Sequence, residues 1–154
     1  MELYHGTNES FSTFDIDKES INSTTFGPVS IKRHGIFLSD NDEFAKQYGK
    51  NLMVCDVEID NLVVLDESLK LKFTDTLNPF DDERDMWLLA KYSKSDWALF
   101  ENELGAKFVN FIQSLGYDGI TFQETLEDST GEYFGNTYVV FSDKQLRCRV
   151  VSHP

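Results

Sequence analysis

The sequence predicts a single α+β domain, in which short strands lie toward both ends and helices are grouped in the middle. A length of 154 residues fits one domain. Strand and helix patterns do not alternate along the chain, which argues against a doubly wound parallel sheet. The many aromatic residues, thirteen Phe, six Tyr and two Trp, argue against disorder. We therefore expect residues 1–154 to form one sheet core with helices packed around it.

The first half of the chain is predicted to hold short strands and one short helix. Residues 19–33 are rich in Ser, Thr, Gly and Pro, which is typical of a loop. Asp40 or Asn41 can cap a helix whose residues Phe44, Ala45 and Tyr48 share one face. The expected order is a strand at Met1–Tyr4, a turn at His5–Thr7, a loop at Glu19–Arg33, a strand at Gly35–Leu38, a helix at Asp40–Tyr48, and strands at Leu52–Ile59 and Leu62–Leu65.

The second half is predicted to contain two helices followed by strands. Phe108, Val109, Ile112 and Leu115 follow helical spacing, and Gly116 is a natural end for that helix. The expected order is a helix at Asp81–Tyr92, a helix within Trp97–Leu115, a strand at Ile120–Phe122, an acidic loop at Glu124–Gly135, a strand at Thr137–Phe141 and an edge strand at Leu146–Val151.

The charge balance is strongly acidic, with 27 Asp plus Glu against 14 Lys plus Arg. Nucleic-acid binding through phosphates needs a basic face, so we do not expect it. The acidity suits solubility or docking onto a basic protein partner.

Two further features indicate a cytoplasmic protein. Cys55 and Cys148 are far apart in sequence and without metal-type spacing, so we expect buried, reduced thiols. The chain shows no signal-peptide pattern and no membrane-length apolar run. The His, Cys and Asp residues form no cluster that predicts a metal site.

The segment His5-Gly6-Thr7 is the first candidate for ligand binding. Gly6 lets a ligand approach the main chain, whose N–H and C=O groups can hold a carboxamide. The imidazole of His5 can bond a ribose hydroxyl, because neutral imidazole both donates and accepts. A purely structural histidine is the alternative.

A second candidate lies between Gly35 and Tyr48. Tyr48 at the end of the short helix can form one wall of a slot, with Phe37 or Phe44 behind it. A planar ring stacked there gains about 1–3 kcal/mol by analogy with base stacking. The alternative is that these aromatic side chains are simply core.

The segments LYHGT, GIFLSDNDEFAKQYG, LGYDGI and NTYVVFSDKQLR together resemble the His-Tyr-Glu class of ADP-ribosyltransferases over nearly the whole chain. The chain looks closest to short phage and bacterial members found within polyvalent proteins. It is also similar in size and layout to the anti-CRISPR ADP-ribosyltransferases. The resemblance implies a split β-sheet core and NAD as co-substrate, without a metal.

The resemblance also implies roles for particular residues. His5 matches the histidine that bonds the nicotinamide-side ribose, and Gly6 matches the glycine that holds the nicotinamide amide. Phe37 stands where the motif tyrosine usually lies, and Tyr48 matches the aromatic that stacks on nicotinamide. The remaining expected binding residues are Thr7, Ser39, Phe44 and Arg33. Arg33 would pair with the pyrophosphate, and the alternative is a solvated loop arginine.

The catalytic glutamate of the family is missing from its usual position, which is Thr137 here. Threonine cannot supply the negative charge that stabilises an oxocarbenium-like centre. A carboxylate must then come from the preceding segment, with Glu132 as first candidate and Glu124 as second, or activity is lost.

The resemblance implies mono-ADP-ribosylation of a protein target. A basic target is favoured by the acidity, and a host defence complex is the natural choice if the protein is phage-encoded. Two alternatives stay open: an NAD-binding or partner-occluding protein without activity, and a toxin that hydrolyses NAD.

Overall fold

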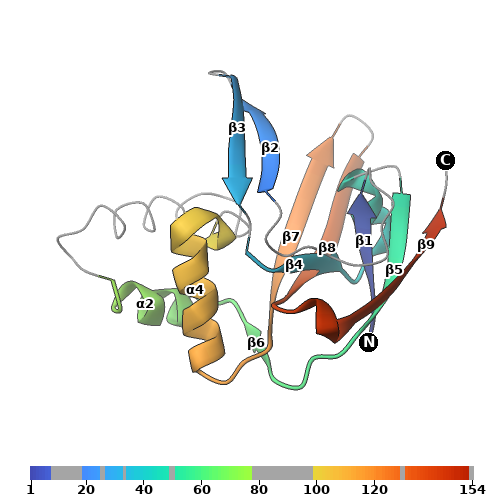
Figure 1. Cartoon of the computed structure of the whole chain (residues 1–154). Helices are drawn as coiled ribbons and strands as arrows, with labels where there is room; N and C mark the ends of the chain where they lie inside the picture. Colours follow the sequence, from blue (N-terminus) through green and yellow to red (C-terminus); the bar gives the residue numbers. More distant parts are fainter. Residues whose placement is uncertain are drawn as a thin grey trace.

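The computed structural model describes residues 1–7, 19–24, 27–32, 34–48, 51–77, 99–128 and 131–152. It is an α+β fold around a seven-stranded sheet of order β6-β7-β8-β4-β1-β5-β9, which confirms the predicted fold class (Figure 1). Neighbouring strands are antiparallel except β6 and β7, which are parallel. The sheet strands are β1 (Glu2–Thr7), β4 (Ile36–Ser39), β5 (Asn51–Val57), β6 (Leu62–Val64), β7 (Gly119–Asp128), β8 (Gly131–Val140) and β9 (Leu146–Ser152).

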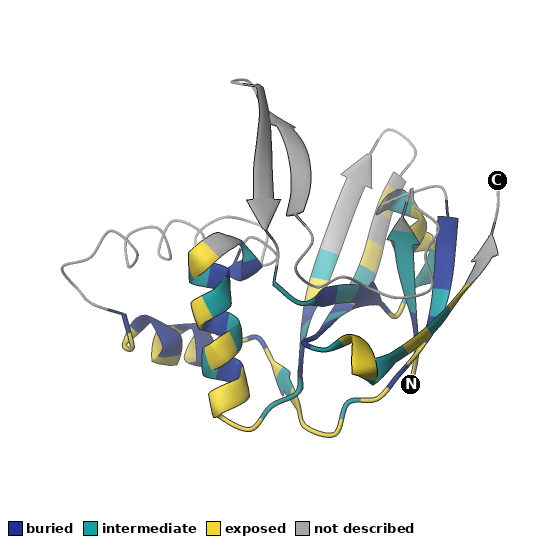
Figure 2. Cartoon of the chain, viewed as in Figure 1, coloured by how far each residue is buried: buried dark blue, intermediate teal, exposed yellow. Residues whose placement is uncertain are grey.

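Two helices cover the β7–β8 part of the sheet. Helix α2 spans Glu67–Thr74 and begins at the Asp66 cap, whose carboxylate accepts from Leu69 N at 2.8 Å. Helix α4 spans Asn102–Ser114 and is followed by Gly116 at φ 89°, as predicted. Figure 2 shows buried and exposed residues alternating along α4. Its buried face joins a core cluster made of Leu65, Leu69, Phe73, Leu77, Leu99, Phe100, Phe108, Ile112, Ile120, Phe122, Val139 and Phe141.

A second core cluster joins β1 and β5 to β4 and the end of β8. It consists of Leu3, Ile36, Leu38, Met53, Cys55, Val57 and Val140. Strand β1 pairs with β5 over its whole length, from Glu2↔Asp56 to Thr7↔Asn51. The turn expected at His5–Thr7 is therefore wrong, because this continuous pairing carries the strand through Gly6.

Two segments expected to be loops are strands instead. Residues 19–33 contain the antiparallel pair β2 (Glu19–Thr24) and β3 (Gly27–Lys32), which forms a separate two-stranded sheet. The described parts of the acidic segment, residues 124–128 and 131–135, belong to β7 and β8, which pair without a break from Gly119↔Val140 to Asp128↔Gly131. Ladder hydrogen bonds and β-branched residues outweigh the turn-forming composition in both places.

The short helix after β4 confirms the predicted start. Helix α1 spans Asp42–Ala45, and the 3-10 helix η1 continues it over Lys46–Tyr48. Asn41 is the cap, because its side chain accepts from Glu43 N at 2.9 Å and Phe44 N at 3.4 Å. The helix predicted at Asp81–Tyr92 lies outside the described residues.

Cys55 and Cys148 form a disulfide, so the expectation of reduced thiols is wrong. The two residues lie directly opposite each other on β5 and β9. Their separation of 93 positions hides this neighbourhood in the sequence. In the described part of the chain, no helix is long and apolar enough to cross a membrane.

Candidate functional site

Strand β4 is the meeting point of the residues singled out from the sequence. On one side it pairs with β8 through all four residues, from Ile36↔Val140 to Ser39↔Thr137. On the other side its described register with β1 is the single pair Tyr4↔Ser39. We call this place, with Tyr4, His5, Phe37 and Ser39, the β1–β4 junction. Among the described residues, β1 and β4 therefore pair through their main chains at one position only, next to His5.

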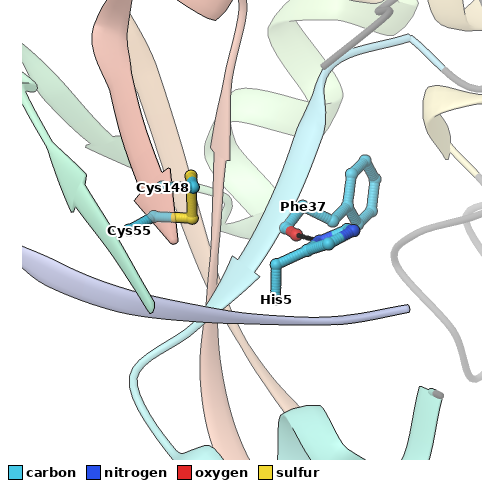
Figure 3. The surroundings of a disulfide bond; sticks show 4 residues. All are labelled: His5, Phe37, Cys55 and Cys148. Carbon is cyan, nitrogen blue, oxygen red and sulfur yellow. Dashed lines mark hydrogen bonds between the residues drawn. A yellow bond between two sulfur atoms is a disulfide. The ribbon is translucent and has the colours of Figure 1, made fainter. Parts of the chain in front are cut away.

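The side chain of His5 forms a hydrogen bond with a main-chain carbonyl group at the β1–β4 junction. Its Nδ1 lies 2.8 Å from the carbonyl oxygen of Phe37. Figure 3 shows the imidazole ring turned toward this carbonyl group. A carbonyl oxygen can only accept, so Nδ1 carries the proton and donates. In the neutral ring Nε2 then has the lone pair, which can accept from a hydroxyl group.

Burial keeps this histidine neutral. Desolvation lowers the pKa of His5 below its usual value of 6.5, and the hydrogen bond to the Phe37 carbonyl opposes that shift more weakly. At neutral pH the ring is thus a donor at Nδ1 and an acceptor at Nε2. The role of ribose-hydroxyl partner that the resemblance implies for His5 requires such an acceptor and stays a prediction.

The ring of Phe37 packs into the hydrophobic core. It packs edge-on against Phe100 at 5.2 Å and Phe122 at 6.4 Å between ring centroids. Phe44 is likewise buried, with a residue exposure of 2%. Both aromatics thus lie where the alternative interpretation put them, and Phe37 contributes its carbonyl group to the β1–β4 junction.

Ser39 is buried at the end of β4, and its Oγ accepts from Asn41 N at 3.1 Å. Gly135 lies beside it on β8. A Cβ atom at Gly135 would stand 2.8 Å from Ser39 Oγ and 3.3 Å from Phe44 Cγ. Glycine is therefore needed there for close approach, and any larger residue would displace Ser39.

The segment after β4 is tied to β8 by polar contacts on both sides of Gly135. The carboxylate of Asp40 accepts from Asn136 N and Asn136 Nδ2, both at 2.9 Å. Asp40 N in turn donates to Asn136 O at 3.1 Å. Asn41 Nδ2 donates to Phe134 O at 2.6 Å. These contacts fix the position of α1 relative to β8.

The two candidate carboxylates stand in different surroundings. The hydroxyl of Thr137 donates to Glu124 Oε2 at 2.5 Å, and Thr137 is 3% exposed. Glu132 is exposed near the hairpin tip, paired with Glu127. It lies five residues from Thr137 along β8, which is about 16 Å and an odd step, so the two point to opposite faces. The structure thus brings Glu124, and not Glu132, to Thr137.

The structure describes only some of the other predicted binding residues. Strand β1 contacts η1, so the elements that carry His5 and Tyr48 are neighbours. Gly6 lies on β1 opposite Leu52. The side chains of Thr7 and Tyr48, and the whole of Arg33, lie outside the described residues. Among the described residues, no group of His, Cys, Asp and Glu is arranged to hold a metal ion.

The hydrogen bond of Thr137 with Glu124 was missed by the sequence analysis. The sequence does contain a signal for it. Ile120, Phe122 and Glu124 are every second residue of one strand, and Thr137 and Val139 are spaced in the same way on the next strand. Reading this segment as a loop hid the pairing.

The mixed seven-stranded sheet with its helices is consistent with an ADP-ribosyltransferase-like fold. The chain belongs to the family described as ADP-Ribosyltransferase in polyvalent proteins, which matches residues 1–150. It is also similar to the structure described as "Crystal structure of an anti-CRISPR protein". That likeness has 18% sequence identity and a TM-score of 0.47, and covers 98% of this chain and 95% of that one. No curated protein matches the chain.

Proposed function

We propose that this protein transfers ADP-ribose from NAD to a protein, with the β1–β4 junction as the nicotinamide-ribose end of the site. The observation that carries the proposal is the hydrogen bond from His5 Nδ1 to Phe37 O. It orients the imidazole where β1 and β4 part and makes Nε2 an acceptor. Family membership supports the class of reaction.

In this proposal the chain's main task is to hold the co-substrate. Nicotinamide leaves from a cationic pyridinium, so its departure needs no general acid. His5 Nε2 accepts from a ribose hydroxyl, and the main chain at Gly6 holds the amide. Binding at fixed positions lowers the entropy cost of the reaction. The aromatic wall belongs to Tyr48, and the pyrophosphate partner is Arg33.

The acceptor in this proposal is a basic bacterial protein, and a single ADP-ribose is added. The formal net charge of −13 favours docking onto a positive surface. A host defence complex is the proposed target, with the protein acting in the host cytoplasm and encoded by a phage. The proposal involves no direct nucleic-acid binding, no membrane and no metal.

Binding and transfer are tested separately. NAD should raise the melting temperature. At an NAD concentration of 100 times Kd, binding stabilises the folded state by about 2.7 kcal/mol. Incubation of the protein with NAD and a bacterial lysate should give proteins with one added ADP-ribose by mass spectrometry. His5→Ala should weaken both results.

Each alternative has its own outcome. Release of nicotinamide from NAD in the absence of any acceptor protein identifies an NAD hydrolase. A melting temperature that NAD does not change, together with no added mass on lysate proteins, contradicts the proposal and leaves the partner-occluding protein.

A further inference from the structure

The contact between Thr137 and Glu124 has the features of a positioned carboxylate. The Thr137 hydroxyl donates to Glu124 Oε2 at 2.5 Å, which is in the range of short, charge-assisted O–H···O⁻ bonds. Thr137 is buried, with 3% exposed, while Glu124 is half-buried. The donor is therefore fixed by packing and the acceptor is partly open to solvent. Such a bond restricts where the carboxylate lies.

The register of the hairpin explains why these two residues meet. Phe122 pairs with Thr137 and Glu124 pairs with Gly135, so Glu124 and Thr137 are diagonal neighbours on one face. Gly135 leaves the position opposite Glu124 without a side chain. The glutamate can thus extend across β8 to the threonine.

In the sheet the carboxylate lies two strands from β1, on the face that Tyr4, Ser39 and Thr137 share through their pairing. Thr137 pairs with Ser39 on β4, and β4 adjoins β1 at the β1–β4 junction. Strands are about 4.8 Å apart, so a carboxylate over β8 stands about 10 Å from β1. Strand β4 lies between β8 and β1, and its Phe37 carbonyl accepts the hydrogen bond from His5.

We infer that Glu124 supplies the carboxylate of the ADP-ribosyl transfer and that Thr137 positions it. This rests on the proposed function. The usual glutamate position on β8 is occupied by the hydrogen-bond donor, and the charge comes from the adjacent strand β7. Glu124 is the catalytic residue in this assignment, and Thr137 acts through it.

The proposed transfer breaks one bond at the ribose and forms another. The bond between the ribose C1′ and the nicotinamide nitrogen breaks, and its electron pair leaves with nicotinamide, which becomes neutral. Glu124 stabilises the positive charge that develops at C1′. The target's nucleophile then forms a bond to C1′ and its proton passes to the Glu124 carboxylate and on to solvent.

The test measures nicotinamide release in a bacterial lysate from NAD labelled in its nicotinamide ring, with the lysate alone subtracted. Glu124→Gln should lower kcat about 100-fold or more, while the NAD dissociation constant changes less than about two-fold. Thr137→Val should lower kcat about 10-fold at similar KM, and Thr137→Ser should restore most of the rate, because the lost bond is to a charged group.

A double-mutant cycle separates positioning from general stability. If Thr137 acts through Glu124, then Thr137→Val added to Glu124→Gln lowers kcat by less than about two-fold. Independent losses that multiply would overturn the positioning role. Glu103→Gln, an exposed carboxylate change on α4, is the matched control, and melting temperatures show that each variant folds.

The remaining outcomes distinguish this inference from the function on which it rests. An active wild type whose activity survives Glu124→Gln but is lost in Glu132→Gln overturns the assignment alone. A wild type that neither binds NAD nor releases nicotinamide overturns the proposed function, and the assignment with it.

Discussion

The two halves of the sheet are stabilised in different ways. The half made of β6, β7, β8 and β4 is covered by α2 and α4, and its core contains rings such as Phe73, Phe100 and Phe108. The half made of β1, β5 and β9 has a disulfide between Cys55 and Cys148 and a smaller apolar cluster, which it shares with residues of β4 and β8. The halves pair at Tyr4↔Ser39. The candidate site therefore lies where two differently stabilised halves of one sheet meet.

The helix-covered half should be the more sensitive to loss of a core side chain. Phe108 is 0% exposed and lies 5.1 Å from Phe73 and 5.3 Å from Phe100 between ring centroids. Phe108→Ala should lower the free energy of unfolding by about 3–5 kcal/mol, measured by urea denaturation. Phe134→Ala, at a side chain 52% exposed, is the control and should change it by less than about 0.5 kcal/mol. Equal losses from both would contradict the assignment of the core.

The disulfide half should respond to reduction. Breaking the Cys55–Cys148 bond should lower the free energy of unfolding by about 2–4 kcal/mol, because the bond restricts the unfolded chain. Amide exchange should then quicken in β5 and β9 before β7 and β8. The double variant Cys55→Ala/Cys148→Ala is the control and should be insensitive to reductant. Uniform acceleration across the sheet would show that the halves do not open separately.

The contact at the β1–β4 junction should matter more for activity than for stability. His5→Ala removes a ribose acceptor and leaves the Phe37 carbonyl without this donor. We expect kcat/KM for NAD to fall about 10–100-fold, since a lost hydrogen bond costs about 1–3 kcal/mol. His34→Gln at the entrance to β4 is the control in the same assay. An unchanged kcat/KM in His5→Ala would exclude the imidazole from the site.

The smallest expected effect is a pH dependence that comes from His5. Its pKa is lowered on folding, so the unfolded state binds more protons as the pH falls below 6.5. The stability of the wild type should therefore decrease as pH falls below this value, by at most about 1.4 kcal/mol per pH unit from this group. His5→Gln should lack this part of the slope in urea denaturation series at several pH values. Parallel slopes in the two proteins would mean that His5 titrates alike in both states.

Local patterns in the sequence determined the elements whose signals lie within a few residues. The cap of α1 at Asp40 or Asn41, the end of α4 at Gly116 and the edge strand β9 all follow from side-chain spacing or backbone conformation. Helix α2 carries a signal of the same kind, because the Asp66 cap is followed by Leu69 and Phe73 at helical spacing. The α+β class and the family resemblance came from the same information.

Tertiary structure alone decided the pairings between distant segments. Composition read His5–Thr7 as a turn and the segment after Glu124 as a loop, but ladder pairing with β5 and β8 makes both extended. The disulfide and the bond between Thr137 and Glu124 join residues 93 and 13 positions apart. Strand register fixes such contacts, and a single sequence does not specify register because each pairing depends on what packs against both strands.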